Sequence, residues 1–403
     1  MAGSDACAPE HRLALALVAT RARREATCSV ISALASRTDF VALETLLRAQ
    51  GMLSLVGRRL LELTDSAPDI FVERVHDYDR EAQHQCLQQQ LITIRLTAAL
   101  ADAGIRALAL KGPLLGERIY GDLGARVSAD IDLLVSAADL GAAIEVLSRL
   151  GYARVPRARL SRLSMPDLHE CLRSPANDLP EVELHWRIHW YEEDFSSAML
   201  RRAQPGPDGC LRPAGPDELL ALLLFYARDG MAGLRLLADL TGWWDRYGDS
   251  LTPGEVDRRA REYPAIVPAL ATASLTARRL GWLPVEYVFD SATLSRASNP
   301  AMRLSNWPLR GKDSQIAANV ALIDCLLSPR GQRRSLFRRH LWLDEETPTA
   351  EQAGAELPRL ATMRARILHL ARMTGRCVIA VWQLRSNGEW APPASDGEGT
   401  DGE

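Results

Sequence analysis

Apolar residues recur at every third or fourth position over the first hundred residues, from about residue 13 to residue 103. This spacing places them on one side of a helix, so it predicts amphipathic helices packed against one another. Gly51, Pro68 and Asp69 interrupt the pattern, and Gly104 stands where the last helix would end. The first part of the chain is therefore predicted to be a bundle of helices.

The pattern changes between Ile105 and about Trp190, where short apolar runs (IRALAL, DIDLLV, VELHW) alternate with one amphipathic segment, AADLGAAIEVLSRLG. The short runs predict strands, and the segment predicts a helix with Gly151 at its C-cap. From Pro216 onward the helical period returns, and the final residues are rich in Gly, Pro and acids with little to bury. We therefore predict an α+β fold in which a small mixed-sheet core is flanked by N-terminal and C-terminal helical regions.

These changes of pattern divide the chain into four parts. The predicted limits are an N-terminal helical bundle at residues 1–103, a mixed-sheet core at 104–200, a C-terminal helical domain at 201–385 and a disordered tail at 386–403.

Composition excludes several classes of protein. A net charge of −3 over 403 residues gives no overall attraction to nucleic acid or anionic lipid, so no nucleic-acid partner is predicted. Seven widely spaced cysteines without a CxxC pair predict free thiols in a reducing compartment rather than disulfides or a zinc cluster. The N-terminus lacks the features of a signal peptide, and the longest apolar run, residues 219–227, is too short to cross a membrane. We expect a cytoplasmic protein with no membrane partner.

Two acidic residues in the run DIDLLV carry the first chemical signal. In a strand, Asp130 and Asp132 project from one face, while Ile131 and Leu133 point the other way into a core. Two carboxylates about 7 Å apart repel each other and need solvent, a cation or a shifted pKa. Oxygen ligands of this kind suit Mg²⁺ or Mn²⁺. The alternative is that both acids lie on the solvated face of an edge strand.

Two neighbouring runs favour the metal site over a solvated edge strand. Lys111 and Gly112 follow the apolar run ALAL, where a lysine charge and a glycine backbone could meet a phosphate. The run EVELHW places Glu181, Glu183 and His185 on one strand face. A third carboxylate on a neighbouring strand would complete a cradle for a metal ion.

The stretch LKGPLLGERIYGDLGARVSADIDLLV resembles the signature of a bacterial family of uncharacterised nucleotidyltransferases, within the wider DNA polymerase beta-like nucleotidyltransferase superfamily. Three further segments are similar to that family: LSRLGY, ELHWRI and LRLLADL. The resemblance implies that Asp130 and Asp132 bind the metal, and that Glu183 is the third carboxylate, acting as a metal ligand or as a general base. It also implies a nucleotide-binding set around the triphosphate, made of Lys111, Gly112, Arg126 and Ser128.

The activity implied by the resemblance is Mg²⁺- or Mn²⁺-dependent transfer of a nucleoside monophosphate from an NTP, such as ATP, to a hydroxyl group. The acceptor would be a small molecule, a peptide or a protein, and some relatives are associated with lasso peptide biosynthesis. The alternative from another class is a non-catalytic protein that keeps the fold and binds a peptide or nucleotide. Pro113 supports that alternative, because proline removes a backbone N–H that could have met a phosphate oxygen.

Three other features have a functional and a purely structural interpretation. The patch His185, Trp186, His189 and Trp190 could form a wall for a base or acceptor, or consist of half-buried strand residues; its His-x-x-x-His spacing would suit zinc on a helix rather than on the expected strand. Asp239 could face the active cleft or solvent. Four arginines could bind an acidic peptide or RNA, or form a solvated face: Arg333, Arg334, Arg338 and Arg339.

Overall fold

The computed structural model describes residues 8–155, 168–190, 192, 194–231, 233–281, 283–284 and 289–304, together with residues 371 and 375. The arginine run at residues 333–339 and the predicted tail at 386–403 lie outside the described residues.

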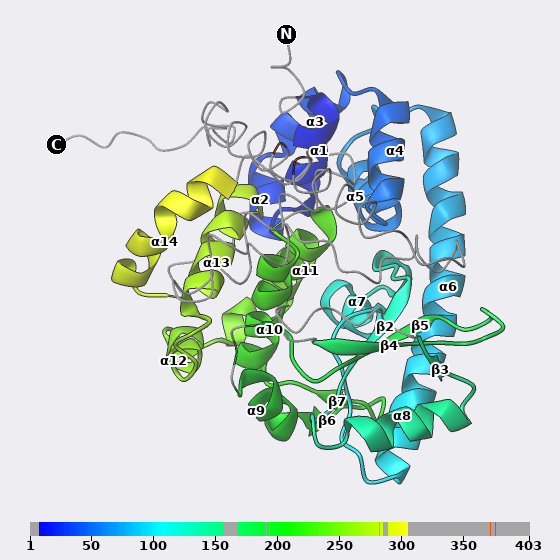
Figure 1. Cartoon of the computed structure of the whole chain (residues 1–403). Coiled ribbons are helices and arrows are strands. Elements are labelled where there is room, and N and C mark those ends of the chain that lie inside the picture. The colour runs from blue at the N-terminus through cyan, green and yellow to red at the C-terminus, as the bar shows by residue number, and fades with distance from the viewer. Residues whose placement is uncertain are drawn as a thin grey trace.

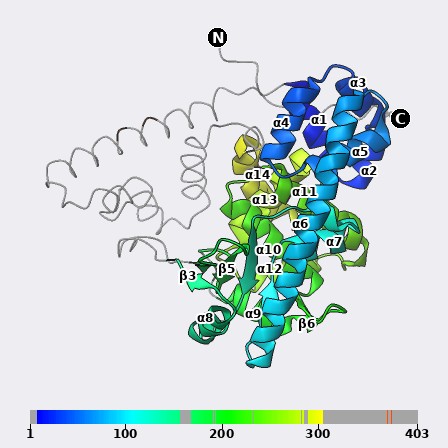
Figure 2. The same cartoon turned by 90° about the vertical axis from the view of Figure 1, so that its right-hand side faces the viewer.

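Residues 9–102 form a series of helices, as their apolar period predicts. These helices are α1 (Pro9–Val18), α2 (Arg21–Ala26), α3 (Cys28–Ala35), α4 (Phe40–Ala49), α5 (Leu53–Leu63) and α6 (Asp69–Asp102). Helix α6 has 34 residues and would therefore be about 50 Å long. It extends from the group of helices at the top of Figure 1 down past the sheet, and Figure 2 shows the same course from the side. This one helix links the N-terminal bundle to the core.

A seven-stranded mixed sheet follows α6, so the structure has the predicted α+β fold. Its strands lie in the order β3-β4-β5-β2-β1-β7-β6, with β2 and β5 parallel at the centre and β4 antiparallel to β5. The strand bounds are β1 (Leu108–Ala109), β2 (Asp130–Leu134), β3 (Ala153–Arg154), β4 (His169–Arg173), β5 (Glu181–His185), β6 (Gln204–Pro205) and β7 (Leu211–Arg212).

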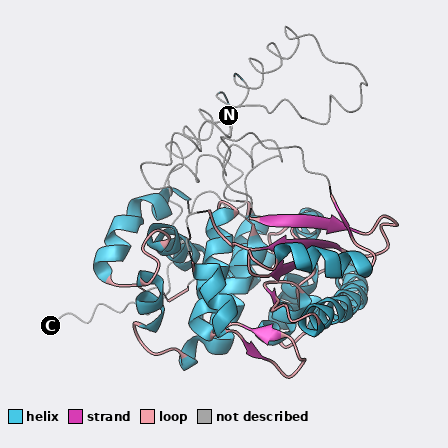
Figure 3. Ribbon diagram, turned by 60° about the horizontal axis from the view of Figure 1, so that its bottom comes forward, coloured by secondary structure: helices cyan, strands magenta, loops and turns pink. Residues whose placement is uncertain are grey.

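The two faces of the sheet differ sharply in polarity. Ile131, Leu133, Val182 and Leu184 from β2 and β5 share a hydrophobic cluster with side chains of α6 and of helix α8 (Leu140–Arg149). The alternate residues of the same strands, acids and histidine, face the other way. In Figure 3 the strands lie between two groups of helices. The alternation of apolar and polar residues along these strands thus gives the sheet one apolar face and one polar face, as predicted.

The remaining helices surround this polar face and the N-terminal bundle. They are α7 (Pro113–Tyr120), α9 (Phe195–Arg202), α10 (Gly215–Arg228), α11 (Leu234–Tyr247), α12 (Glu255–Arg261), α13 (Val267–Gly281) and α14 (Ser291–Leu304), with short 3₁₀ turns at Leu123–Ala125 and Gly248–Ser250. One hydrophobic cluster joins Leu13 and Leu53 of the N-terminal helices to Leu223 and Trp243 of α10 and α11. The N-terminal and C-terminal helical regions therefore share one hydrophobic core. The division of the chain into four parts stays a prediction.

The expected element ends are found where glycine permits a left-handed backbone. Helix α6 ends at Asp102 and Gly104 has φ +75°, while α8 ends at Arg149, its C-cap is Leu150 and Gly151 follows with φ +96°. Gly151 was predicted to be the C-cap, but the C-cap is Leu150 and Gly151 stands one position beyond it, where glycine is favoured because it carries no Cβ. Among the described residues, no helix has both the length and the apolar character that a membrane crossing requires.

A close contact between α5 and α6 provides a test of this packing. A Cβ added at Gly57 would come within 2.7 Å of a γ-carbon of Val75, a stiff side chain. We expect Gly57→Ala to lower the free energy of unfolding by about 1–2 kcal/mol, because overpacking of about 1–3 kcal/mol exceeds the helix-propensity gain of about 1 kcal/mol. In the Val75→Ala background the same substitution should be neutral or stabilising. Urea unfolding of the four proteins measures this coupling, and an equal effect in both backgrounds would contradict the contact.

Candidate functional site

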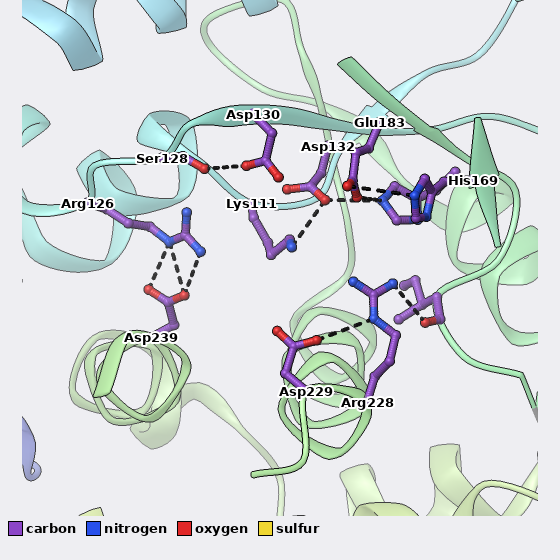
Figure 4. A network of polar contacts seen from close by, with 12 residues as sticks. Lys111, Arg126, Ser128, Asp130, Asp132, His169, Glu183, Arg228, Asp229 and Asp239 are labelled. Carbon is purple, nitrogen blue, oxygen red and sulfur yellow. Dashed lines mark hydrogen bonds and ion pairs between the residues drawn. The ribbon is translucent and has the colours of Figure 1, made fainter. Parts of the chain in front are cut away.

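The centre of the polar face is a pair of carboxylates on adjacent parallel strands. Asp132 of β2 lies directly opposite Glu183 of β5, and Asp130 lies opposite Glu181 in the same register. Figure 4 shows Asp130, Asp132 and Glu183 beside one another along the sheet. Asp132 is 3% exposed, whereas Asp130 is half-buried and the Glu183 side chain is 23% exposed. The cluster therefore has a sealed end and an end that reaches solvent.

Lys111 is brought to Asp132 by the end of strand β1. The Leu110 N–H donates to the Asp132 carbonyl at 3.0 Å, so the next residue leaves the sheet beside the acid. The Lys111 Nζ lies 3.1 Å from Asp132 Oδ1 and 4.3 Å from the centre of the Phe225 ring. A cation over an aromatic face is favourable, and here the ring also shields the ion pair from water. Lys111 is thus held against the sealed end of the cluster.

The turn after Lys111 depends on glycine. Gly112 has φ +85°, which L-residues with a Cβ rarely adopt, and a Cβ at this position would meet nothing within 4 Å. Pro113 then begins α7, where a missing N–H costs no helical hydrogen bond. Proline is accordingly compatible with the fold at this turn, although it offers one donor fewer to an anion.

His185 bridges the two opposing acids. Its Nε2 lies 3.1 Å from Asp132 Oδ1 and 3.2 Å from Glu183 Oε2, and the residue is fully buried against the edge of Phe225. The other ring nitrogen, Nδ1, is buried and has no hydrogen-bond partner in the described part of the chain. The imidazole therefore directs its polar contacts entirely toward the two carboxylates.

These contacts keep both acids ionised. Burial disfavours the charged form of Asp132, but Lys111, the hydrogen bond from His185 and the charge of Arg228 outweigh it and lower the pKa of Asp132 far below its usual range. Burial and the Asp132 charge also oppose ionisation of Glu183. The hydrogen bond from His185 and the neighbouring histidines nevertheless hold the pKa of Glu183 below its usual value. Both side chains are thus prepared to bind a cation.

Helix α6 supports the segment that carries the acids. Gln85 Nε2 donates to the Ser128 carbonyl at 3.2 Å, Gln89 Nε2 donates to the Asp130 carbonyl, and the Cys86 thiol donates to the Arg126 carbonyl at 3.5 Å. Three alternate carbonyls of an extended segment thus find partners on consecutive turns of one helix. This support fixes how Asp130 enters the sheet.

Arg126 and Ser128 lie close to the acids but are engaged by other groups. Ser128 Oγ donates to Asp130 Oδ1 at 2.7 Å. The buried Arg126 forms a bidentate pair with Asp239 of α11, with Nε at 2.9 and 3.0 Å and Nη2 at 2.8 Å, and Tyr120 donates to the same carboxylate at 3.3 Å. Of the three Arg126 side-chain nitrogens, Nη1 is the one without a hydrogen-bond partner among the described residues. Asp239 therefore holds Arg126 instead of facing solvent.

Phe225 and Arg228 approach the site from helix α10. Arg228 lies over the Phe225 ring at 4.7 Å, pairs with Asp229 at 3.5 Å and contributes positive charge at Asp132. Two cations, Lys111 and Arg228, thus lie close to the Phe225 ring. Figure 4 shows the helix bearing Arg228 and Asp229 across from the acids. The site consequently lies between the polar face of the sheet and the helices α10 and α11.

Strand β4 adds two residues that the sequence did not single out. His169 and Cys171 lie opposite His185 and Glu183, and the His169 Nε2 is 3.7 Å from Glu183 Oε1. Their alternation in the run HECLR could have placed them on one strand face. The sequence does not show, however, that this strand pairs with β5 and so brings them beside Glu183 and His185. His189, by contrast, is buried away from these acids, and burial and the nearby Arg228 lower its pKa to about 3.

The donor set fits a divalent cation. Asp132, Glu183 and His185 each offer an atom within 4.8 Å of the others, and Asp130 stands on the same face of β2. Mg²⁺ is commonly bound by one or two protein carboxylates when substrate phosphates supply further oxygen ligands. Asp130, Asp132, Glu183, Lys111 and Gly112 are thus gathered at one place, with Ser128 and Arg126 at its border.

Comparison with protein families identifies a family for this chain. Residues 36–281 match the model of a family described as uncharacterised nucleotidyltransferase, which is more than half of the chain. The matched residues include every helix and strand that contributes to the site. A comparison with curated proteins finds no match.

The ionised state of Asp132 predicts a pH dependence of stability. Because its pKa is lowered by folding, Asp132 stabilises the native state above the unfolded value of about 3.9, and this contribution is lost as the pH falls. We expect the unfolding free energy of the wild type in EDTA to fall between about pH 5 and pH 3 more steeply than that of Asp132→Asn, by up to about 1.4 kcal/mol per pH unit. Urea titrations at each pH measure the slopes. The matched variant Asp77→Asn, at an exposed carboxylate on α6, should keep the wild-type slope; a wild-type slope in Asp132→Asn would refute the prediction.

Proposed function

The chain belongs to the family of uncharacterised nucleotidyltransferases, and on this premise we propose that it transfers a nucleoside monophosphate from an NTP to a hydroxyl group. The observation that carries the proposal is the register of β2 and β5, which sets Asp132 beside Glu183 with Lys111 at 3.1 Å from Asp132. Acids and a lysine in this arrangement are what metal-assisted phosphoryl transfer requires.

We propose Mg²⁺, or Mn²⁺, as the cofactor. Asp130, Asp132 and Glu183 would hold the ion, since all three lie on one face of the two parallel strands. When bound, the ion supplies charge stabilisation at the reacting phosphate and lowers the pKa of an attacking hydroxyl. In the protein alone Lys111 pairs with Asp132, and His185 hydrogen-bonds Asp132 and Glu183, so binding of the ion would compete with these contacts.

The other residues act on the nucleotide in this proposal. Lys111 would turn from Asp132 to a phosphate oxygen when the ion is bound. No atom lies within 4 Å of where a Cβ of Gly112 would be, which would leave room for a phosphate beside the backbone of this turn. Nη1 is the Arg126 nitrogen that has no partner among the described residues and would face a phosphate, while Ser128 orients Asp130. Glu183 is the acid with the greatest access to solvent among the two in register, which supports its role as ligand or as general base for the acceptor hydroxyl.

The acceptor in this proposal is a hydroxyl of a small molecule, a peptide or a protein. The description of the family names no acceptor, and nothing in the comparison links the chain to lasso peptide biosynthesis. A protein that only binds a peptide or nucleotide in the same fold would keep these acids without a reaction, and the test below separates the two.

Thermal unfolding of the full chain with ATP, GTP, CTP and UTP, each with Mg²⁺, Mn²⁺ or EDTA, tests the proposal. A ligand that binds only the native state stabilises it by about 2.7 kcal/mol at one hundred times its dissociation constant. We expect a metal-dependent rise in Tm with at least one nucleotide in the wild type, retained in Asp77→Asn and lost in Asp132→Asn. The preferred nucleotide is then incubated with hydroxyl acceptors, and pyrophosphate release is measured. Absence of any shift at millimolar nucleotide would overturn the transferase and leave a protein that binds a peptide, whereas a shift without pyrophosphate release would favour a nucleotide-binding protein.

A further inference from the structure

Four side chains of metal-binding type form a square on one face of the β4–β5 hairpin. His169 lies opposite His185, and Cys171 lies opposite Glu183, because the two antiparallel strands pair in that register. Residues two apart in a strand share a face, so both residues of each strand point to the same side. The square is therefore fixed by the backbone pairing of the hairpin.

The distances within the square suit direct coordination. The ligand atoms of His169, Cys171 and Glu183 all lie within 4.8 Å of one another, and His169 Nε2 is 3.7 Å from Glu183 Oε1. Ligands bound to one tetrahedral zinc ion are roughly 3.3–3.8 Å apart, given metal–ligand bonds of about 2.0–2.3 Å. Small rotamer changes would bring the three atoms to a common ion.

The chemistry of this set differs from that of the acid pair. A thiol, an imidazole and a carboxylate are the ligands of Zn²⁺ and related transition metals, whereas Mg²⁺ prefers oxygen alone. All three residues are half-buried, in contrast to Asp132 and His185, which are buried. The more exposed end of the cluster thus carries the softer metal ligands, a thiol and an imidazole.

We propose that His169, Cys171 and Glu183 bind a Zn²⁺-class transition-metal ion, at a site separate from the acids Asp130 and Asp132. Three protein ligands leave the fourth tetrahedral position for water or for a substrate oxygen, as in zinc sites that act on substrates. The site shares Glu183 with the proposed magnesium cluster, so one carboxylate joins a hard and a soft site. Binding of the transition metal does not itself depend on nucleotide transfer.

Cobalt provides a direct probe of this site in the full-length, metal-free protein. Co²⁺ bound to a thiolate gives a near-ultraviolet charge-transfer band that oxygen and nitrogen ligands alone do not give. We expect a band that saturates at one Co²⁺ per chain, that is removed by one equivalent of Zn²⁺, and that is absent in Cys171→Ser. His169→Ala should weaken the Co²⁺ affinity by at least about tenfold, since even indirect partners of metal ligands change affinity by that factor.

Two controls separate this inference from the proposed function. Cys28→Ser removes another partly buried free cysteine and should keep the band, and Asp130→Asn should keep it as well. No band in the wild type, or a band that persists in Cys171→Ser, would overturn the site. Nucleotide-dependent stabilisation that is intact in Cys171→Ser would leave the transferase standing in that case, so the two proposals fail independently.

Discussion

Two like charges side by side in the middle of a sheet impose the main constraint on this structure. The parallel register of β2 and β5 fixes Asp132 opposite Glu183, and one of the two is buried. A buried carboxylate without a partner costs several kcal/mol, so the surroundings must supply positive charge. Lys111 from the end of β1 supplies it and Arg228 of α10 adds to it, while His185 of β5 contributes a hydrogen bond to the carboxylate. The position of the β1 turn and of helix α10 follows from this requirement.

The segment before Asp130 shows how distant parts of the chain meet at the acids. Gln85, Cys86 and Gln89 of helix α6 donate hydrogen bonds to backbone carbonyls of this segment. Asp239 of α11 pairs with Arg126 in the same segment. A buried ion pair contributes little net stability against an apolar alternative, but loss of one partner leaves a charge stranded. The Arg126–Asp239 pair therefore acts chiefly to set the position of α11 relative to the acids. Helices α6 and α11 thus both hold the short segment that leads into β2.

Local pattern was sufficient to predict the elements that carry the acids. The alternation of DIDLL and EVELH gave both strands and the shared face of Asp130 and Asp132, and the helical period with Pro68 and Gly104 bracketed α6. What sequence could not provide was pairing between segments far apart. Strand β4 is a short run of mixed burial, and its alignment with β5 decides that Cys171 meets Glu183.

Arg126 illustrates the same limit from the opposite direction. Its sequence position next to the acids suggested a phosphate ligand, yet two of its three side-chain nitrogens, Nε and Nη2, bond to Asp239, which lies 113 residues away. Asp239 was itself open to two interpretations, because a single acid on an amphipathic helix carries no signal of its partner. Contacts of this kind depend on how helices pack, and packing is decided by the whole core rather than by any local run.

The uneven burial of the cluster determines from which side a ligand can arrive. Phe225 covers His185 and the Lys111–Asp132 pair, and Asp132 is 3% exposed. The Glu183 and His169 side chains are 23% and 25% exposed, and Asp130 is half-buried. A substrate must therefore reach the acids along the side where Asp130, Glu183 and strand β4 meet solvent. His169 and Cys171 of β4 lie on that side, next to Glu183.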